Sequence, residues 1–496
     1  MLRSLVKDSA VYAVGVIATQ LVGFIMIPIY TRVLTPADYG VIETIVRLVD
    51  VINLLLAMGL AEALLRHYYL AKDEKERRRL IATTFSFNLM IIVVGCALTL
   101  PLAPQLAHLA FGHGRYATYV AVWLVAMLLQ NLAELPLTLW RAEGKPWRFT
   151  GISLCRLLTQ VTANIIFVVL LRWGVWGVAM SNLINAAAWS TLLGIAVRRK
   201  YGILIDTSWL RPVLRYGLPL VPATLSQFIL HYSDRFFLAR YATESELGLY
   251  SLAYRFGMLV SISMRVVTTA WYPWVFSTAK SDQDMISIRR ATSLVLVVLA
   301  MIAGTLILCT EIVLRWMSAP RFWQASQYVS LIAIGCWFFA AHIPWSVGAR
   351  LVNKTEVVAK AHLWTAGASL LGYAWFIPRY GAWGAAVMTL LSFLCLSLTC
   401  LIWSEKTMPV RQDVHAISFA LLLMVASACG DAVLRARGDV GTGIRLIAAA
   451  GIFAAALAYV NYRLSERAVE KLWKRLWHRI RLRQDRHPGD HENTLP

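Results

Sequence analysis

The chain has 496 residues, of which 58% are hydrophobic and only 15% are charged. Soluble proteins contain about 25% charged residues, so too few polar side chains remain here to cover soluble domains, and a soluble enzyme is excluded. The net charge of +21 would suggest a nucleic-acid partner for a soluble protein. In a membrane protein such an excess orients the chain instead, and we expect no nucleic-acid partner.

Fourteen apolar segments follow one another along the chain, each near the length of about 20 residues that a membrane-spanning helix needs. Helices satisfy their own backbone hydrogen bonds in lipid, so the sequence predicts an all-α polytopic membrane protein with about 14 transmembrane helices. The segments lie near residues 9–31, 41–63, 80–103, 117–139, 150–171, 174–197, 212–239, 248–271, 290–315, 325–348, 356–378, 382–404, 413–434 and 443–462.

Basic residues are distributed unevenly between the loops. If the N-terminus lies in the cytoplasm, all eleven lysines, among them Lys72, Lys145 and Lys354, lie on the cytoplasmic side. Loops rich in Lys and Arg stay in the cytoplasm. We therefore expect both termini to be cytoplasmic and the chain to be a multi-pass protein of the cell inner (plasma) membrane. The seven cysteines form no CxxC pair, and we expect neither a disulfide framework nor a metal site.

Segments about 208 residues apart resemble each other. The loop after the first span reads RVLTPADYG at residues 32–40, and the loop after the seventh reads RYATESELG at residues 240–248. Seven residues past the final glycine of each loop stands an arginine within a span, Arg47 and Arg255. Further downstream, RWGVWGVA at residues 172–179 matches RYGAWGAA, and Gly144-Lys145 matches Asn353-Lys354.

The repeat unit holds six spans, so both copies enter the membrane in the same direction. Such parallel repeats are typical of transporters whose two bundles move around a central site. The sequence therefore predicts two parallel six-helix bundles, at 1–205 and 206–405, followed by two further helices at 406–462. Residues 463–496 combine apolar and basic residues at helical spacing with a polar tail, which predicts a basic amphipathic cytoplasmic helix that binds membrane lipids. The alternative for this helix is docking of a glycosyltransferase.

LTPADYG after the first span, SDRFFLARY through the seventh and ELGLYSLAYR into the eighth resemble the polysaccharide transporter family of Wzx-type flippases for lipid-linked oligosaccharides, including O-antigen. That family belongs to a superfamily that also contains multidrug extruders and the lipid II flippase. The resemblance covers essentially the whole chain. It implies transfer of an undecaprenyl-diphosphate-linked oligosaccharide from the cytoplasmic to the periplasmic leaflet, by alternating access around a cationic cavity, in surface polysaccharide biosynthesis.

Charged residues within the spans are the candidate site residues, because a charge at bilayer depth normally faces a cavity or a partner. Glu43, Arg47 and Asp50 lie on one face of the second span. They form either a self-neutralised packing cluster or a site in which Arg47 binds diphosphate and the acids tune it. Arg255 in the eighth span either binds the same diphosphate through its planar fork or forms a salt bridge with Asp234, itself a candidate cation or proton site.

The remaining candidates have plainer alternatives. Arg156 and Glu134 are expected to form a structural pair near the cytoplasmic side. Arg265 either snorkels to the interface or meets a phosphate at the cytoplasmic entrance. Tyr250 and Tyr254 are expected either to anchor their helix at the membrane interface or to stack on sugar.

These patterns favour a flippase that uses no cofactor and no catalytic residue. The alternative is a cation-coupled multidrug extruder of the same superfamily, which unpaired arginines in the cavity disfavour because they repel cationic drugs. A membrane polysaccharide polymerase or ligase is a third interpretation, disfavoured by the short outer loops. The expected partners are lipid-linked oligosaccharide and membrane lipids, with a polysaccharide polymerase or glycosyltransferase as a further partner.

Overall fold

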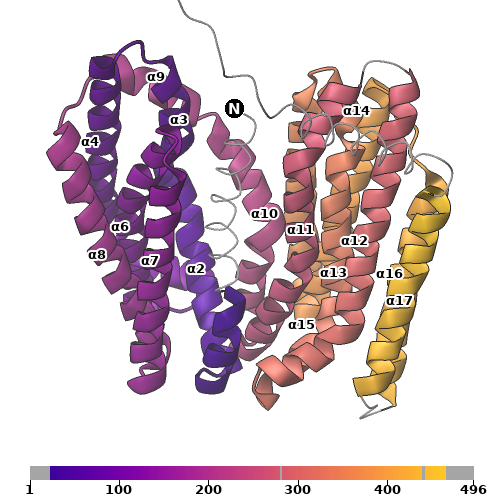
Figure 1. The fold of residues 1–496 in the computed structure, drawn as a ribbon. Coiled ribbons are helices and arrows are strands. Elements are labelled where there is room, and N and C mark those ends of the chain that lie inside the picture. Colours follow the sequence, from indigo (N-terminus) through magenta and orange to yellow (C-terminus); the bar gives the residue numbers. More distant parts are fainter. Residues whose placement is uncertain (1–22, 280–281, 438–441, 465–496) are drawn as a thin grey trace, which may run out of the picture. The chain divides into compact units, whose positions relative to one another are not determined.

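The computed structural model describes residues 23–279, 282–437 and 442–464, and helices make up nearly all of these ranges (Figure 1). Within them, twelve helical segments are long and apolar enough to cross a membrane, which confirms an all-α multi-pass membrane protein. After the helix Gly23–Val33, the elements are α2 (Pro36–Ala57), α3 (Leu60–Leu70), α4 (Glu74–Thr99), α5 (Ala103–Phe111), α6 (Ala117–Ala142), α7 (Pro146–Asn164), the π-helix η1 (Ile165–Leu170), α8 (Gly174–Tyr201), α9 (Thr207–Gly217), α10 (Leu220–Tyr241), α11 (Glu244–Thr278), α12 (Asp282–Met317), the 3₁₀-helix η2 (Pro320–Ala325), α13 (Ser326–Trp345), α14 (Val347–Leu351), α15 (Thr355–Thr407), α16 (Val414–Ala436) and α17 (Thr442–Leu464).

Two features separate this set of helices from the predicted spans. The first predicted span is described only from residue 23 onward. The eleventh and twelfth predicted spans lie in the single 53-residue helix α15, whose backbone leaves the helical conformation at Gly381. The exact number of spans and the cytoplasmic placement of the termini therefore stay predictions. The predicted amphipathic helix of residues 463–496 lies outside the described residues beyond Leu464.

By their contacts the described residues form two compact units. Unit 1 contains the chain up to Ala270 and again from Thr310 to Pro409, and unit 2 contains Trp271 to Cys309 and the described chain from Val410 onward. Unit 1 thus includes most of both predicted six-helix bundles. We call the predicted bundles 1–205 and 206–405 the first half and the second half. Their boundaries stay predictions.

The first half has a continuous apolar core between α2, α3, α4, α6 and α8 (indigo to purple in Figure 1). Leu48, Leu64, Phe85 and Leu128 are among its buried members. Val213 of α9 joins the same core, although α9 follows the predicted boundary at residue 206. The Asp206 carboxylate caps α9 by accepting hydrogen bonds from the backbone and hydroxyl of Ser208, which lower the pKa of Asp206. Helix α9 therefore attaches the start of the second half to the first.

The second half of unit 1 is built from α10, α11, α13 and α15, and α15 packs along both α10 and α13. Its largest buried side chains include Trp337, Tyr250, Tyr254 and Phe393, each less than 2% exposed. Polar groups occur within this core, and the hydroxyls of Tyr250 and Tyr373 both contact the Thr389 hydroxyl. The interior of the second half therefore contains hydrogen-bonded hydroxyl groups among its aromatic side chains.

The segments that match in sequence also match in backbone conformation. Gly144 and Asn353 both adopt the left-handed region, with φ of 65° and 58°. Gly174 and Gly381, each at the start of a Gly/Trp-rich helix, have φ of 56° and 52°. Most side chains are strained at such positive φ, and Gly and Asn are the residues that adopt it most readily. Both copies of the repeat therefore make the same turn at these positions.

Helices α2 and α11, which begin in the matching loops, cross at the matching glycines. A Cβ on Gly40 would collide with the Glu244 carbonyl oxygen, and a Cβ on Gly248 would collide with the Pro36 carbonyl oxygen. Gly40 and Gly248 are 208 residues apart in the sequence, and so are Pro36 and Glu244, so the contact is reciprocal, as in a two-fold symmetric interface. We call it the glycine contact. Because glycine lacks a side chain, the two backbones approach closely here.

The starts of α2 and α11 share an N-cap threonine but use the matching acid differently. The Thr243 hydroxyl accepts from the Glu246 backbone N–H at 3.1 Å, as the Thr35 hydroxyl accepts from that of Asp38. Thr35 and Asp38 form a reciprocal capping box, with Pro36 in the first turn of α2. The Glu246 carboxylate, at the position that matches Asp38, instead accepts from the backbone N–H of Ala382 at 2.7 Å. Glu246 therefore caps the second part of α15, just after its break at Gly381.

In unit 2, a buried ion-pair cluster joins α16 and α17. The Asp431 carboxylate accepts from Arg435 of its own helix and from Arg445 of α17, both at 2.8 Å. The Asp431 and Arg445 side chains are each 4% exposed. The two helices are thus held by charge-assisted hydrogen bonds inside a largely apolar unit.

Candidate functional site

One face of α2 carries the predicted charged triad. The Arg47 guanidinium donates from Nε and Nη2 to Glu43 Oε1, at 3.1 and 2.9 Å, and from Nη1 to Asp50 Oδ2 at 2.7 Å. This geometry follows from the helical spacing, which places residues three and four apart on one side. Glu43 is buried and Asp50 is partly exposed. The predicted intrahelical cluster is therefore formed.

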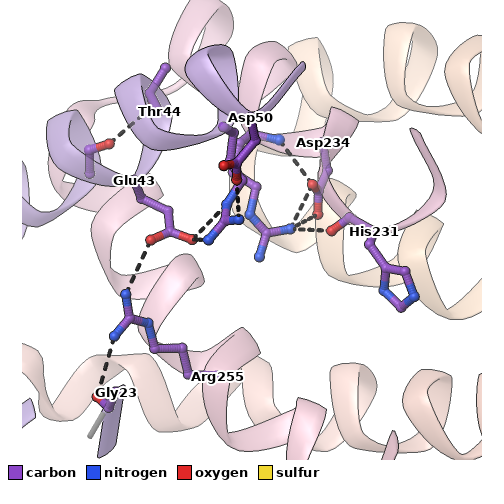
Figure 2. Close-up of polar contacts among 10 residues, drawn as sticks. Gly23, Glu43, Thr44, Asp50, His231, Asp234 and Arg255 are labelled. Atoms are coloured by element: carbon purple, nitrogen blue, oxygen red, sulfur yellow. Dashed lines mark hydrogen bonds and ion pairs between the residues drawn. The ribbon is translucent and has the colours of Figure 1, made fainter. Parts of the chain in front are cut away.

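The second carboxylate oxygen of Glu43 binds an arginine from the other half. Arg255 of α11 donates from Nη2 to Glu43 Oε2 at 3.3 Å and from Nη1 to the Gly23 carbonyl oxygen at 3.4 Å (Figure 2). Both distances are long for hydrogen bonds of a charged donor. Glu43 thus bridges Arg47 and Arg255, one from each half, with one oxygen for each. The glycine contact brings the two helices to this distance.

Arg255 does not pair with Asp234, the partner that the sequence suggested. The Asp234 carboxylate accepts instead from Arg235 Nη1, at 2.7 and 3.0 Å, and from the Tyr250 hydroxyl at 2.5 Å. Asp234 and Arg235 are each 1% exposed. In Figure 2, dashed lines join Arg255 to Glu43 and to Gly23, and none joins it to Asp234. Asp234 is therefore a buried, paired carboxylate in this conformation, and a role in ion coupling stays a prediction.

Tyr250 and Tyr254 lie inside the second half, where they are 0% and 1% exposed. The Tyr254 hydroxyl contacts the His231 ring at 3.1 Å. These positions differ from an interfacial belt, because both rings are enclosed by α10, α13 and α15 rather than facing the surface. Stacking of sugar on either ring stays a prediction.

The other predicted residues lie outside this arrangement. Arg156 of α7 donates to Glu134 of α6 at 2.9 Å, so the predicted pair is present. Arg265 is exposed near the predicted cytoplasmic end of α11. Its suggested contact with a phosphate at the entrance stays a prediction.

The structure adds one residue that the sequence did not single out. Arg235 falls within the seventh predicted span, so its position inside a span was a signal that could have identified it. Its guanidinium carbon lies 4.0 Å from the centre of the Tyr254 ring, 5.3 Å from that of Tyr232 and 5.5 Å from that of Tyr250. Arg235 is thus a buried cation in an aromatic surround.

Six residues form what we call the central cluster. Three acids and three arginines contribute, so the cluster has no net formal charge. Its members are Glu43, Arg47, Asp50, Asp234, Arg235 and Arg255. Each arginine is paired with a carboxylate, which offsets much of the cost of charge at bilayer depth. Since a guanidinium binds carboxylate and phosphate in the same planar geometry, the cluster can exchange an internal carboxylate for an external phosphate.

Comparisons with known proteins agree with the fold. A family model described as "Polysaccharide biosynthesis protein" matches residues 29–343. Lsg locus putative protein 1 of Haemophilus influenzae is 22% identical over 341 residues, which cover 66% of this chain and 80% of that protein. The probable low-salt glycan biosynthesis flippase Agl15 of Haloferax volcanii is 23% identical over 294 residues, which cover 56% of this chain and 59% of that protein.

Two solved structures extend the likeness over more of the chain. The lipid II flippase MurJ in an inward closed conformation has a TM-score of 0.69 at 14% identity, covering 94% of this chain and 100% of that one. An inward-facing multidrug resistance transporter of the MATE family and the MOP superfamily has a TM-score of 0.60 at 16% identity, covering 80% and 93%. At such identities the likeness shows a shared fold and leaves the substrate open.

Proposed function

The chain belongs to the family of polysaccharide biosynthesis proteins, and we propose that it is a flippase for lipid-linked oligosaccharide. It would move an undecaprenyl-diphosphate-linked oligosaccharide from the cytoplasmic to the periplasmic leaflet by alternating access. The named flippases among its relatives and structural neighbours support this function. No covalent chemistry is required, because the lipid crosses the membrane unchanged.

The observation that carries the proposal is the bridge formed by Glu43. Its two oxygens bind Arg47 and Arg255, which come from different halves. A phosphate presents oxygens to two guanidinium groups in the same way. We infer that the diphosphate replaces Glu43 between these arginines, and that Asp50 helps to release it by competing for Arg47.

The glycine contact supports the alternating-access part of the proposal. On the predicted periplasmic side, the backbones of α2 and α11 approach closely, and the Tyr116 hydroxyl at the start of α6 donates to Glu244 at 2.6 Å. Arg321 of η2 also donates to the carbonyl oxygens of Thr31 and Arg32. These contacts between the halves would close the periplasmic side while the substrate enters from the cytoplasm. Opening would separate them.

A multidrug extruder remains the rival within the same fold. Its cavity would need acids available to a cationic drug. In the described residues of the central cluster, Glu43, Asp50 and Asp234 are each bound to an arginine, which disfavours that function. Dye efflux by cells that express the chain, reduced by Asp50→Asn, would favour it.

Complementation of a strain that lacks its own lipid-linked oligosaccharide flippase tests the proposal. Wild type, Arg47→Ala, Arg255→Ala and Arg255→Lys would be compared at equal membrane abundance, with surface glycan as the readout. Arg379→Ala serves as the matched control, because Arg379 is exposed and bonds the Trp375 carbonyl oxygen of its own helix. We expect wild type and Arg379→Ala to restore glycan, Arg255→Lys to restore part of it, and both cluster Ala variants to fail.

Two outcomes would contradict the proposal. If wild type restores no glycan in strains that make different repeat units, the substrate class is wrong. If Arg47→Ala and Arg255→Ala both restore glycan fully, transport does not use the bridge, and these arginines serve the fold alone.

A further inference from the structure

Arg235 has hydrogen-bond donors that its surroundings do not use. Its Nη1 donates to Asp234 and to the His231 carbonyl oxygen at 2.8 Å. Its Nε is buried without an acceptor, and among the described residues no acceptor contacts its Nη2. Unsatisfied buried donors are uncommon in native structures, and each one calls for an explanation. An anion bound to these donors would supply that explanation.

The unused donors form one recognisable face of the guanidinium. Nε and Nη2 point along its side edge, and two parallel N–H groups on such an edge match two oxygens of one phosphate. Asp234 holds the opposite nitrogen with both of its oxygens and is itself held by Tyr250. The pair thereby fixes the guanidinium and leaves its side edge unengaged. Asp234 is thus a positioning residue for Arg235.

The Tyr232 ring lies close to both Arg235 and Arg47, and so connects Arg235 with the rest of the central cluster. Its ring centre lies 4.2 Å from the Arg47 guanidinium carbon and 5.3 Å from that of Arg235. Two cations therefore share one half-buried phenol ring. If the ring turns aside, both guanidinium groups face the same space, and their mutual repulsion would favour an anion between them.

The three arginines differ in what a ligand must displace. Arg47 uses Nε, Nη1 and Nη2 on Glu43 and Asp50, so an anion binds it only by displacing a carboxylate. Arg255 makes long bonds, at 3.3 and 3.4 Å. In the described residues, both Nε and Nη2 of Arg235 are without an acceptor, whereas Nη2 of Arg47 and Nη2 of Arg255 are each bonded to Glu43.

We propose that Arg235 is a third anion-binding arginine, that Tyr232 covers it in this conformation, and that its Nε–Nη2 edge binds the second phosphate of a diphosphate. This inference rests on the proposed function, in which Arg47 and Arg255 take the first phosphate. It explains how the site distinguishes a diphosphate lipid from a monophosphate lipid or a phospholipid headgroup. Arg235 is then a specificity-determining residue.

Calorimetric titration of the full chain in lipid nanodiscs, with inorganic diphosphate and inorganic phosphate as probes, tests this. The decisive variant is the double substitution Asp234→Asn with Arg235→Gln, which removes both charges and leaves no unpaired buried ion. We expect diphosphate affinity to fall about tenfold or more, as the loss of charge-assisted hydrogen bonds implies. Phosphate affinity should change little, so the preference for diphosphate disappears.

Two further variants separate binding from structure. Asp431→Asn with Arg445→Gln neutralises a buried pair of the same chemistry in unit 2 and should keep the diphosphate preference. Arg235→Lys keeps a positive charge beside Asp234, so the ion pair is retained. A lysine lacks the Nε–Nη2 edge, so the preference for diphosphate over phosphate should be lost. Thermal unfolding of each variant shows that it is folded.

The outcomes distinguish this inference from the proposed function. If wild type prefers diphosphate and either Arg235 variant keeps that preference, Arg235 is only the counter-ion of Asp234, and the inference is wrong. The inference is also wrong if wild type binds diphosphate and phosphate with equal affinity. If wild type binds neither probe, the anion site itself fails, and with it the proposed function.

Discussion

Two acid–arginine pairs join helices in this protein in opposite ways. Asp431 and Arg445 of unit 2 lie 2.8 Å apart, and each side chain is 4% exposed. Glu43 and Arg255 of unit 1 lie 3.3 Å apart, and the Arg255 side chain is 30% exposed. A short, buried pair is costly to break, whereas a long, partly exposed pair contributes little stability. The first pair is suited to a permanent joint, and the second to a contact that opens and closes.

The largest effect on stability is expected when the Asp431–Arg445 pair, the permanent joint, is broken. Asp431→Asn removes the buried carboxylate charge that Arg445 contacts at 2.8 Å, so we expect a loss of stability of about 3–5 kcal/mol. Thermal unfolding of the purified protein measures this as a lower midpoint. The double substitution with Arg445→Gln should recover most of the loss. Equal midpoints for wild type and the single variant would show that this pair is not a structural joint.

A smaller effect is expected at the glycine contact. Gly248→Ala places a methyl group against the Pro36 carbonyl oxygen, and such overpacking costs about 1–3 kcal/mol in the closed conformation. The reporter is a cysteine at Leu247→Cys, a position 1% exposed, labelled from the periplasm by an impermeant maleimide. Labelling should be faster in the Gly248→Ala chain than in the chain with Gly248. The chain without Leu247→Cys gives the background labelling of the native cysteines. Gly367→Ala is the control, because a Cβ placed there would meet no atom of another helix within 4 Å. Identical labelling of both variants would contradict a role for the glycine contact in closure.

Tyr116→Phe removes one hydrogen bond between the halves and should cost about 1 kcal/mol. The same labelling assay should show a weaker increase than for Gly248→Ala. Burial, and then the hydrogen bond to Glu244, raise the pKa of Tyr116. Because the pKa of Tyr116 is raised, its hydroxyl keeps its proton and the hydrogen bond is fully present below about pH 10, the ordinary tyrosine pKa. The bond is lost only as the pH rises through the pKa of Tyr116 in the folded state. The difference between wild type and Tyr116→Phe should thus stay constant from about pH 6 to 9, and a change within that range would argue against this bond.

The smallest effect on stability is expected at the contact that matters most for transport. Arg255→Gln should cost less than about 1 kcal/mol, because the pair is long and partly exposed. The same variant should nevertheless abolish restoration of surface glycan. A large fall in its unfolding midpoint would place Glu43–Arg255 with the permanent joints and remove the contrast between the two pairs.

The central cluster shows where sequence reasoning succeeds and where it ends. The triad on α2 was predictable because its spacing is local to one helix. The bridge from Glu43 to Arg255 was not, since it depends on how α2 and α11 cross, and Asp234 was an equally reasonable partner. Arg235 was not singled out, although the span that contains it was recognised, because its burial depends on the packing of α10 against α11. Tyr250 and Tyr254 were expected at the interface, but the rotation of α11 turns both rings inward.

The sequence by itself determined the membrane class, most of the helical segments and the 208-residue repeat. These properties follow from the composition and length of each segment, because lipid requires every span to be apolar and internally hydrogen-bonded. Only the tertiary structure decided which carboxylate each arginine binds, which donors of Arg235 stay unused, and that Gly40 and Gly248 touch. Those features depend on the rotation and crossing of helices far apart in the chain. In a largely apolar sequence such rotations are weakly encoded, because lipid-facing and buried faces are both apolar.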